Sequence, residues 1–220
     1  HGFEDRGAKI KVAFFKQNTS LNQNVIEKYN ANILTCTRQF KYSTKNENSI
    51  DMVLSLNGIP IVAIELKNQL TGQSVDNAKK QFMYDRNPKE LCFQFDKRFL
   101  VYFAVDLYEI AMTTKLAGKD TFFLPFNQGS NGAGEVGGAG NPENPNGYTT
   151  SYLWEKVLNK DMLMNILEKF FQRVEEDKIT YKNGVEQKKH TIKLIFPRYH
   201  QLDVVSKLIE DVRINGSGKN

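Results

Sequence analysis

The stretch from Ile50 to Lys67 constrains the fold of this chain more than any other. Apolar residues alternate with other residues from Ile50 to Leu56, which is the period of two expected for a strand with one buried face. Asn57-Gly58 then turns the chain. Ile59 to Lys67 follows as a nearly continuous apolar run, typical of a strand buried on both faces until its charged end. The sequence therefore predicts two consecutive strands joined by a tight turn.

Further elements are predicted on both sides of these strands. A short helix over 22–29 and a strand over 33–42 precede them. After them, Ser74 can cap a helix that Asn87-Pro88 stops, and two more strands are predicted over 99–105 and 109–113. The order strand, strand, helix, strand, strand is that of a small mixed α/β or α+β layer.

The second half of the chain has a different texture. Residues 128–148 hold seven glycines and two prolines, which predicts a long surface loop. Apolar residues at helical spacing predict an amphipathic helix of about four turns from Leu163 to Val174. Asn183-Gly184 indicates a surface hairpin or turn, followed by a strand over 191–196. A last amphipathic helix carries Leu202 to Val212, and Gly216 can end it.

Size and composition bound the partners and the compartment. With 220 residues, we expect one main domain plus a C-terminal extension. The net charge of +5 fits a polyanionic partner such as nucleic acid, although charge alone does not decide it. No apolar run of membrane-spanning length and no signal peptide is present, so we expect a cytoplasmic protein without a membrane partner. Cys36 and Cys92 lie far apart, without zinc-site spacing, and are expected to be reduced.

Asp51 and Glu65 form the chemically informative pair, and its use depends on strand register. If Asn57-Gly58 is a two-residue turn in a regular hairpin, Asp51 faces Ile64 and the two carboxylates point to opposite faces of the sheet. If the loop has three residues with a Gly-containing bulge, Leu56 pairs with Pro60 and Asp51 faces Glu65. Their Cβ atoms are then roughly 5 Å apart. Only the second register makes a shared site, so a shared site predicts the three-residue loop.

A shared site would suit a hard divalent cation. Two carboxylates that close repel each other unless a cation lies between them, and oxygen ligands suit Mg²⁺ or Mn²⁺, with the Leu66 carbonyl as a third ligand. Lys67 would lie on the same face as Glu65 and could orient a water molecule or stabilise a phosphodiester transition state. The plainer alternative is that Glu65 and Lys67 are a charged strand end and Asp51 a solvated strand residue.

The amino-acid sequence around these residues closely resembles the nuclease domain of the R (HsdR) subunit of type I restriction enzymes. The resemblance rests on the stretch from Ser49 through Asn57-Gly58-Ile59-Pro60 and Ile64-Glu65-Leu66-Lys67-Asn68 to Gln73. Similar segments cover most of the chain: Gln81 to Arg86 with Pro88, Phe103-Ala104-Val105-Asp106, Phe123 to Asn127, Ser151-Tyr152-Leu153-Trp154, and Phe196-Pro197-Arg198-Tyr199-His200-Gln201.

The resemblance implies an α/β fold of the restriction-endonuclease-like, PD-(D/E)xK type, a mixed sheet flanked by helices. It implies that Asp51 and Glu65 are metal ligands and that Lys67 is the catalytic lysine. Members of this family also carry a Gln-x-x-x-Tyr motif that positions DNA or the active site. Gln81 matches its first position and is carried over as a site residue, whereas Asp85 stands at the tyrosine position. Tyr84 lies one residue too early.

The C-terminal segment resembles the start of a helicase motor. Arg198-Tyr199-His200-Gln201 resembles the Q motif, with Gln201 as the residue that reads the adenine of ATP. Residues 215–220 do not make a phosphate loop, because a helix precedes them and Asn220 follows the lysine. We therefore expect a nuclease domain over 1–150, a helical linker over 151–190 and the start of a truncated helicase/ATPase domain over 191–220.

The sequence thus indicates a Mg²⁺-dependent DNA endonuclease domain of a type I restriction R subunit. In the parent enzyme, the resemblance implies ATP-driven translocation on double-stranded DNA, with sequence recognition by separate methylation and specificity subunits. Two alternatives stay open. One is a stand-alone repair nuclease of the same fold, and the other is a non-catalytic DNA-binding or assembly module.

Overall fold

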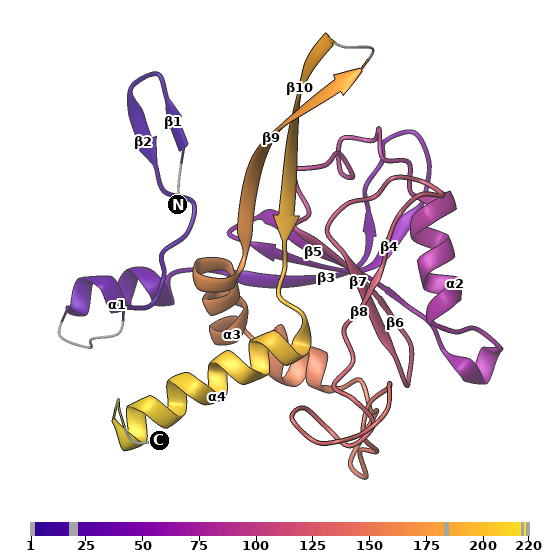
Figure 1. Ribbon diagram of the computed structural model, residues 1–220, viewed down its shortest axis with the longest axis vertical. Coiled ribbons are helices and arrows are strands. Elements are labelled where there is room, and N and C mark those ends of the chain that lie inside the picture. The colour runs from indigo at the N-terminus through magenta and orange to yellow at the C-terminus, as the bar shows by residue number, and fades with distance from the viewer. Residues whose placement is uncertain (1–2, 18–21, 183–184, 217, 219–220) are drawn as a thin grey trace.

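A six-stranded mixed sheet forms the centre of the computed structural model, which describes residues 3–17, 22–182, 185–216 and 218 (Figure 1). Its strands lie in chain order: β3 (Leu34–Lys41), β4 (Ser49–Leu56), β5 (Ile59–Leu66), β6 (Val101–Val105), β7 (Ile110–Thr113) and β8 (Leu124–Pro125). Only β5 and β6 run parallel, and the other neighbours are antiparallel. The predicted mixed α/β class and the order strand, strand, helix, strand, strand are confirmed.

The crossover between the parallel strands carries the helix that covers one face. After η1 (Gln69–Thr71), α2 (Val75–Lys80) continues as a π-helical turn, η2 (Gln81–Asp85), and ends before Pro88 as predicted. Ser74 caps α2 together with Asn77. A crossover of this kind lets a helix pack back onto the sheet, and Val75, Ala78 and Phe82 are buried there.

Side chains from the two faces of the sheet build two separate cores. The first core is on the face of Val62, Ile64 and Phe103. The second core is on the face of Ala63 and Tyr102, under α2. Successive residues of a strand point to opposite faces, which explains how neighbours in β5 and β6 serve different cores. Strand β4 contributes to both cores, so the predicted single buried face of that strand is wrong.

Helices near the C-terminus complete the first core. They are η3 (Leu153–Val157), α3 (Lys160–Asn165), η4 (Ile166–Phe170) and α4 (Tyr199–Asn215). Tyr152, Leu163 and Tyr199 are buried in the same cluster as the sheet residues. Gly216 ends α4 as predicted, but Val205, Leu208, Ile209 and Val212 of its predicted apolar side are exposed. The boundaries at 150/151 and 190/191 stay predictions.

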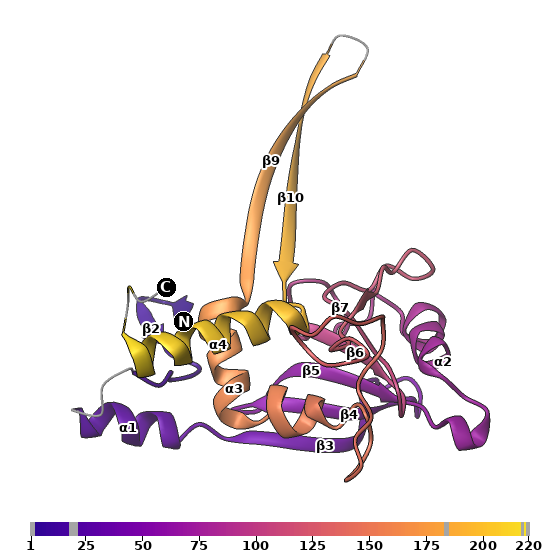
Figure 2. The same ribbon diagram turned by 60° about the horizontal axis from the view of Figure 1, so that its bottom comes forward.

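Two long strands leave the body of the protein as a hairpin (Figure 2). Strand β9 (Gln172–Lys182) pairs with β10 (Val185–Ile195), including Lys182 with Val185; the predicted turn Asn183-Gly184 lies outside the described residues. The predicted helix from Leu163 to Val174 is therefore too long, because the helical segment ends at Phe170 and Val174 pairs with Lys193. Of the predicted helical linker 151–190, only the part before β9 is helical.

The remaining segments are short or irregular. The predicted N-terminal helix is α1 (Gln23–Asn30), capped by Asn22, and a small hairpin of β1 (Phe3–Asp5) and β2 (Ala8–Ile10) precedes it. The glycine-rich segment forms the predicted loop and folds back on itself, with Gly129 N–H donating to the Gly140 carbonyl at 2.8 Å. Among the described residues, no helix is long and apolar enough to cross a membrane.

Candidate functional site

The turn between β4 and β5 differs from the prediction, yet the acids still meet. Leu56 pairs with Ile59, so Asn57-Gly58 is a two-residue turn and the predicted three-residue loop is wrong. Both turn residues have positive φ, 50° and 84°, as a type I′ turn requires. The register shift lies one pair further on. Ser55 faces Pro60 whereas Leu54 faces Val62, which leaves Ile61 as the extra residue of a β-bulge.

This bulge restores the register that a shared site needs. Beyond it, Met52 faces Ile64, and the next position on each strand is Asp51 and Glu65. The two acids therefore lie opposite each other, where β4 and β5 stop pairing. The arrangement predicted from a longer loop is reached through a bulge instead, because either device adds one residue to β5 relative to β4.

Glu65 is fully buried and shares its burial with Arg86. Glu65 is 0% exposed and Arg86 is 3% exposed. The Arg86 Nε and Nη2 atoms donate to Glu65 Oε1 at 2.9 and 2.6 Å, and Nη2 also donates to the Ser49 carbonyl at 2.7 Å. The guanidinium also lies 5.3 Å from the centre of the Tyr42 ring. Arg86 thus ties the end of η2 to the beginning of β4 and to the end of β5.

The second oxygen of Glu65 is left without a hydrogen-bond partner in the described part of the chain. Oε2 is buried, and Arg86 binds only Oε1. Buried carboxylate oxygens are nearly always paired with a donor or a cation, since desolvation without compensation is costly. An unpartnered oxygen beside a second carboxylate is what a site for a divalent cation would present. The residues present therefore fit such an ion.

The electrostatics of Glu65 agree with this geometry. Burial raises the pKa of the Glu65 carboxyl to about 7; the charge of Arg86 acts to lower it and the charge of Asp51 to raise it. The positive charge of Arg86 is therefore not enough to offset the loss of hydration next to a second acid. A proton or an additional cation stabilises the pair near neutral pH.

Asp51 is held by one donor on each carboxylate oxygen. The Leu66 N–H donates to Oδ2 at 2.8 Å, and the Gln39 Nε2 donates to Oδ1 at 3.1 Å. The hydrogen bond from the Leu66 N–H takes the place of a backbone–backbone hydrogen bond at the point where β4 and β5 separate. Because Leu66 directly follows Glu65, this bond fixes the Asp51 carboxylate next to the second acid.

Lys67 and Gln81 line a common hollow, whose lining residues include neither Asp51 nor Glu65. Its volume is about 260 Å³, and it is lined by Lys67, Gln73, Asn77, Lys80, Gln81, Tyr84 and Asp85. A second hollow of about 490 Å³ is lined by Glu47, Asn48, Ser49, Gln81, Asp85 and Arg86. Gln81 and Asp85 line both, so they lie between the predicted lysine and the Arg86–Glu65 pair. The Lys67 N–H donates to the Val105 carbonyl at 2.8 Å, which fixes its backbone on β6.

The π-helical turn η2 orients the side chains that follow α2. Phe82 is fully buried in the second core, whereas Tyr84 is 69% exposed. The wider turn of a π-helix changes which side chains face the sheet, and such turns are frequent at functional sites. Here it leads directly to Arg86, which turns inward to Glu65.

Sequence reasoning missed Arg86 and Gln39 as parts of the site. Arg86 lies within the segment from Gln81 to Arg86 that carries part of the family resemblance, but its partner Glu65 is 21 residues away in the chain. Gln39 lies on a neighbouring strand, 12 residues from Asp51. Neither contact follows from local spacing, since both depend on how strands and helix come together.

Gln201 lies elsewhere in the molecule. It is exposed in the first turn of α4, where its Oε1 accepts a hydrogen bond from the Arg198 N–H at 3.0 Å. Helix α4 packs in the first core and α2 in the second, so the two helices lie on opposite faces of the sheet (Figure 1). His200 is exposed, and the predicted surface residue His190 is half-exposed and bonded to Asp177.

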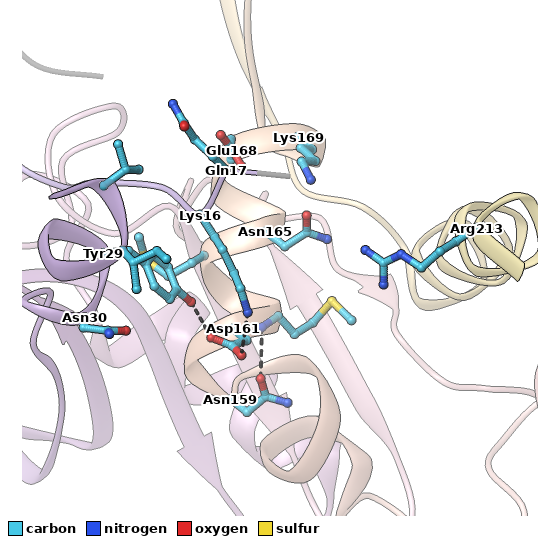
Figure 3. A pocket seen from close by; sticks show the side chains of 14 residues that line it. Lys16, Gln17, Tyr29, Asn30, Asn159, Asp161, Asn165, Glu168, Lys169 and Arg213 are labelled. Carbon is cyan, nitrogen blue, oxygen red and sulfur yellow. Dashed lines mark hydrogen bonds and ion pairs between the residues drawn. The ribbon is translucent and has the colours of Figure 1, made fainter. Parts of the chain in front are cut away.

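A larger cavity of about 910 Å³ lies between α1, α3 and α4 (Figure 3). Its polar groups neutralise one another: the Tyr29 hydroxyl donates to Asp161, and Lys16 lies 3.7 Å from the same carboxylate. The Tyr29 hydrogen bond is the main factor that lowers the pKa of the Asp161 carboxyl. Arg213 reaches toward the cavity from α4 (Figure 3). These contacts join the N-terminal segment to α3 and resemble a structural junction more than a reactive site.

Among the described residues, no cluster of three or more His, Cys, Asp or Glu side chains could hold a metal ion. Any ion at the pair of acids would therefore depend on Asp51, Glu65, backbone carbonyls and water. This is the usual situation for Mg²⁺, which keeps several water ligands.

The part of the chain that holds these residues matches a known protein family. Residues 6–121, more than half of the chain, match the family model described as type I restriction enzyme R protein N terminus. The matched region includes the strands β3 to β7, α2 and all residues around Asp51 and Glu65. No curated protein matches the chain in sequence.

Proposed function

The chain belongs to the family of type I restriction enzyme R protein N-terminal domains, and on this premise we propose that Asp51, Glu65 and Lys67 form a Mg²⁺-dependent site that hydrolyses DNA phosphodiester bonds. The observation that carries the proposal is the buried Glu65 Oε2, which lacks a partner within the described residues and lies next to a second carboxylate. A buried ion pair that served structure alone would satisfy both oxygens.

Asp51, Glu65 and the Leu66 carbonyl would hold Mg²⁺ or Mn²⁺. When bound, the ion supplies positive charge for the scissile phosphate and favours ionisation of water. Side chains of the protein orient the ligands and the substrate. Arg86 keeps the Glu65 carboxylate turned so that only one oxygen is used. Lys67 stabilises the charge that develops on the phosphate, and Gln81, in the same hollow, orients the phosphate or the attacking water.

The fold and partners in this proposal follow from the same family. We assign the sheet with its crossover helix α2 to the PD-(D/E)xK type. Double-stranded DNA is the substrate, and the net charge of +5 favours it. Lys79 and Lys80 on α2, of which Lys80 lines the hollow, are candidates for phosphate contacts. Gln201 is proposed to read the adenine of ATP in the full-length subunit, whose partners are the methylation and specificity subunits in the cytoplasm.

Calorimetric titration of the 220-residue protein with Mn²⁺ tests the metal site. We expect one binding event in the wild type and its loss in Asp51→Ala and in Glu65→Ala. Asp161→Ala is the matched control, since it removes an acid from the other cavity and should leave Mn²⁺ binding unchanged. Binding that persists in both site variants would rule out the proposed ligands and favour a module without catalytic activity.

A further inference from the structure

Gln39 has an unusual backbone conformation in the middle of strand β3. Its φ is +48°, in the left-handed region that residues other than glycine adopt only with backbone strain. It is flanked by regular pairs on both sides, Arg38 with Met52 and Phe40 with Ile50. A strained residue inside an otherwise paired strand persists only when the surrounding structure holds it there.

At this residue the side chains of β3 change from one face of the sheet to the other. Leu34 packs against the first core whereas Phe40 packs against the second, although even-numbered residues of a regular strand share one face. The partner strand does the same, with Met52 on the first core and Ile50 in the second. The change of face on both strands lies at Gln39 and at the residue opposite to it, which is Asp51.

The side chain of Gln39 links this irregularity to the acid. Ser49 Oγ donates to Gln39 Oε1 at 2.6 Å, and the Gln39 Nε2 donates to Asp51 Oδ1 at 3.1 Å. The Ser49 hydroxyl therefore fixes the amide so that its NH₂ group faces the carboxylate. With the Leu66 N–H on Oδ2, each Asp51 oxygen accepts one hydrogen bond and retains lone-pair capacity for a cation.

We propose that Gln39 is a positioning residue of the metal site, whose left-handed backbone and amide hold Asp51 in the orientation in which it can share a cation with Glu65. This inference rests on the proposed function. A neutral amide suits the task because it donates a hydrogen bond without adding a positive charge that would repel the cation. Residues that orient metal ligands typically contribute between tenfold and a hundredfold in metal affinity.

The substitution Gln39→Gly separates the side chain from the backbone. Glycine adopts positive φ without strain, so we expect the thermal midpoint of the metal-free protein to stay the same or rise. The amide is lost, so the Mn²⁺ dissociation constant should increase roughly tenfold. A residue with a purely structural role would not separate the two measurements in this way.

Two further variants make the test specific. Ser49→Ala removes only the group that orients the amide, and a several-fold weaker Mn²⁺ affinity is expected. Thr37→Ala, an exposed position on the same strand, should leave the affinity unchanged.

The outcomes separate this inference from the proposed function. If Asp51→Ala binds Mn²⁺ as the wild type does, the proposed function fails and this inference fails with it. If Asp51→Ala loses binding but Gln39→Gly binds within twofold of the wild type, only the inference about Gln39 fails. A lower thermal midpoint together with weaker binding in Gln39→Gly would make Gln39 a structural residue and would also overturn the inference.

Discussion

The contact between Arg86 and Glu65 illustrates how much of the site is decided by single buried residues. Both side chains are buried, and the guanidinium binds one carboxylate oxygen through two of its nitrogens. Pairs of this kind are costly to break, because the remaining charge stays buried without compensation. The same pair leaves Glu65 Oε2 free, so it serves stability and the proposed ion together.

Removing the arginine should therefore destabilise the protein strongly. We expect Arg86→Leu to lower the free energy of unfolding by about 3–5 kcal/mol, measured by urea denaturation without metal. The exposed pair of Arg213 and Glu210 offers the control, and Arg213→Ala should change the free energy by about 0.5 kcal/mol or less. Similar effects of the two substitutions would show that the Glu65 charge is compensated in another way.

The raised pKa of Glu65 predicts a pH dependence of stability. The folded protein binds this proton more tightly than the unfolded chain, so the contribution to stability is full below about pH 4.5 and is lost as the pH rises through about 7. Between pH 5 and pH 8, without metal, the wild type should lose more unfolding free energy than Glu65→Gln, by at most roughly 3 kcal/mol. If the unfolding free energies of the two proteins, measured by urea denaturation, changed equally with pH across this range, the raised pKa of Glu65 would be disproved.

The candidate site was predictable from the sequence only where its chemistry is local. Asp51, Glu65 and Lys67 lie on two consecutive strands, so their spacing could be analysed as a question of register. Arg86 and Gln39 could not be found this way. Their roles depend on a crossover helix and on a neighbouring strand, which no periodicity describes.

At the scale of elements, the β4–β5 hairpin decides whether the acids meet. Its two-residue turn and its bulge at Ile61 together give the register that the sequence had linked to a longer loop. Asn57-Gly58 favours a two-residue turn in a hairpin, but a bulge has no local signal in an apolar run. The same limit explains Gln172–Val174, whose helical spacing was overruled by pairing with β10.

The turn itself can be tested by a single substitution. Gly58 has a φ of +84°, and a Cβ atom at this position would meet nothing within 4 Å. The cost of Gly58→Val is therefore conformational, and we expect a loss of about 1–2 kcal/mol in unfolding free energy by urea denaturation. Gly147→Ala, where φ is not positive, serves as the control and should change stability by less than about 0.5 kcal/mol. Equal effects would contradict the type I′ geometry.

At the scale of the whole molecule, the sheet separates two kinds of surface. The face under α2 holds the acids, Arg86 and the hollow with Lys67, whereas the other face is covered by η3, α3 and α4. The mixed α/β class and most elements of the sheet followed from the sequence. The length of the projecting hairpin and the exposed apolar residues of α4 did not, since local patterns do not tell which strands pair or which faces are covered.

The central claim is that Asp51, Glu65 and Lys67 form a site that cuts DNA, and cleavage by the R protein that carries this domain tests it most directly. Plasmid DNA is incubated with the assembled restriction complex, ATP and Mg²⁺, and the wild type is compared with Lys67→Ala. We predict that Lys67→Ala abolishes cleavage, while ATP hydrolysis continues because the motor is untouched. Cleavage by Lys67→Ala at the rate of the wild type would contradict the proposed site.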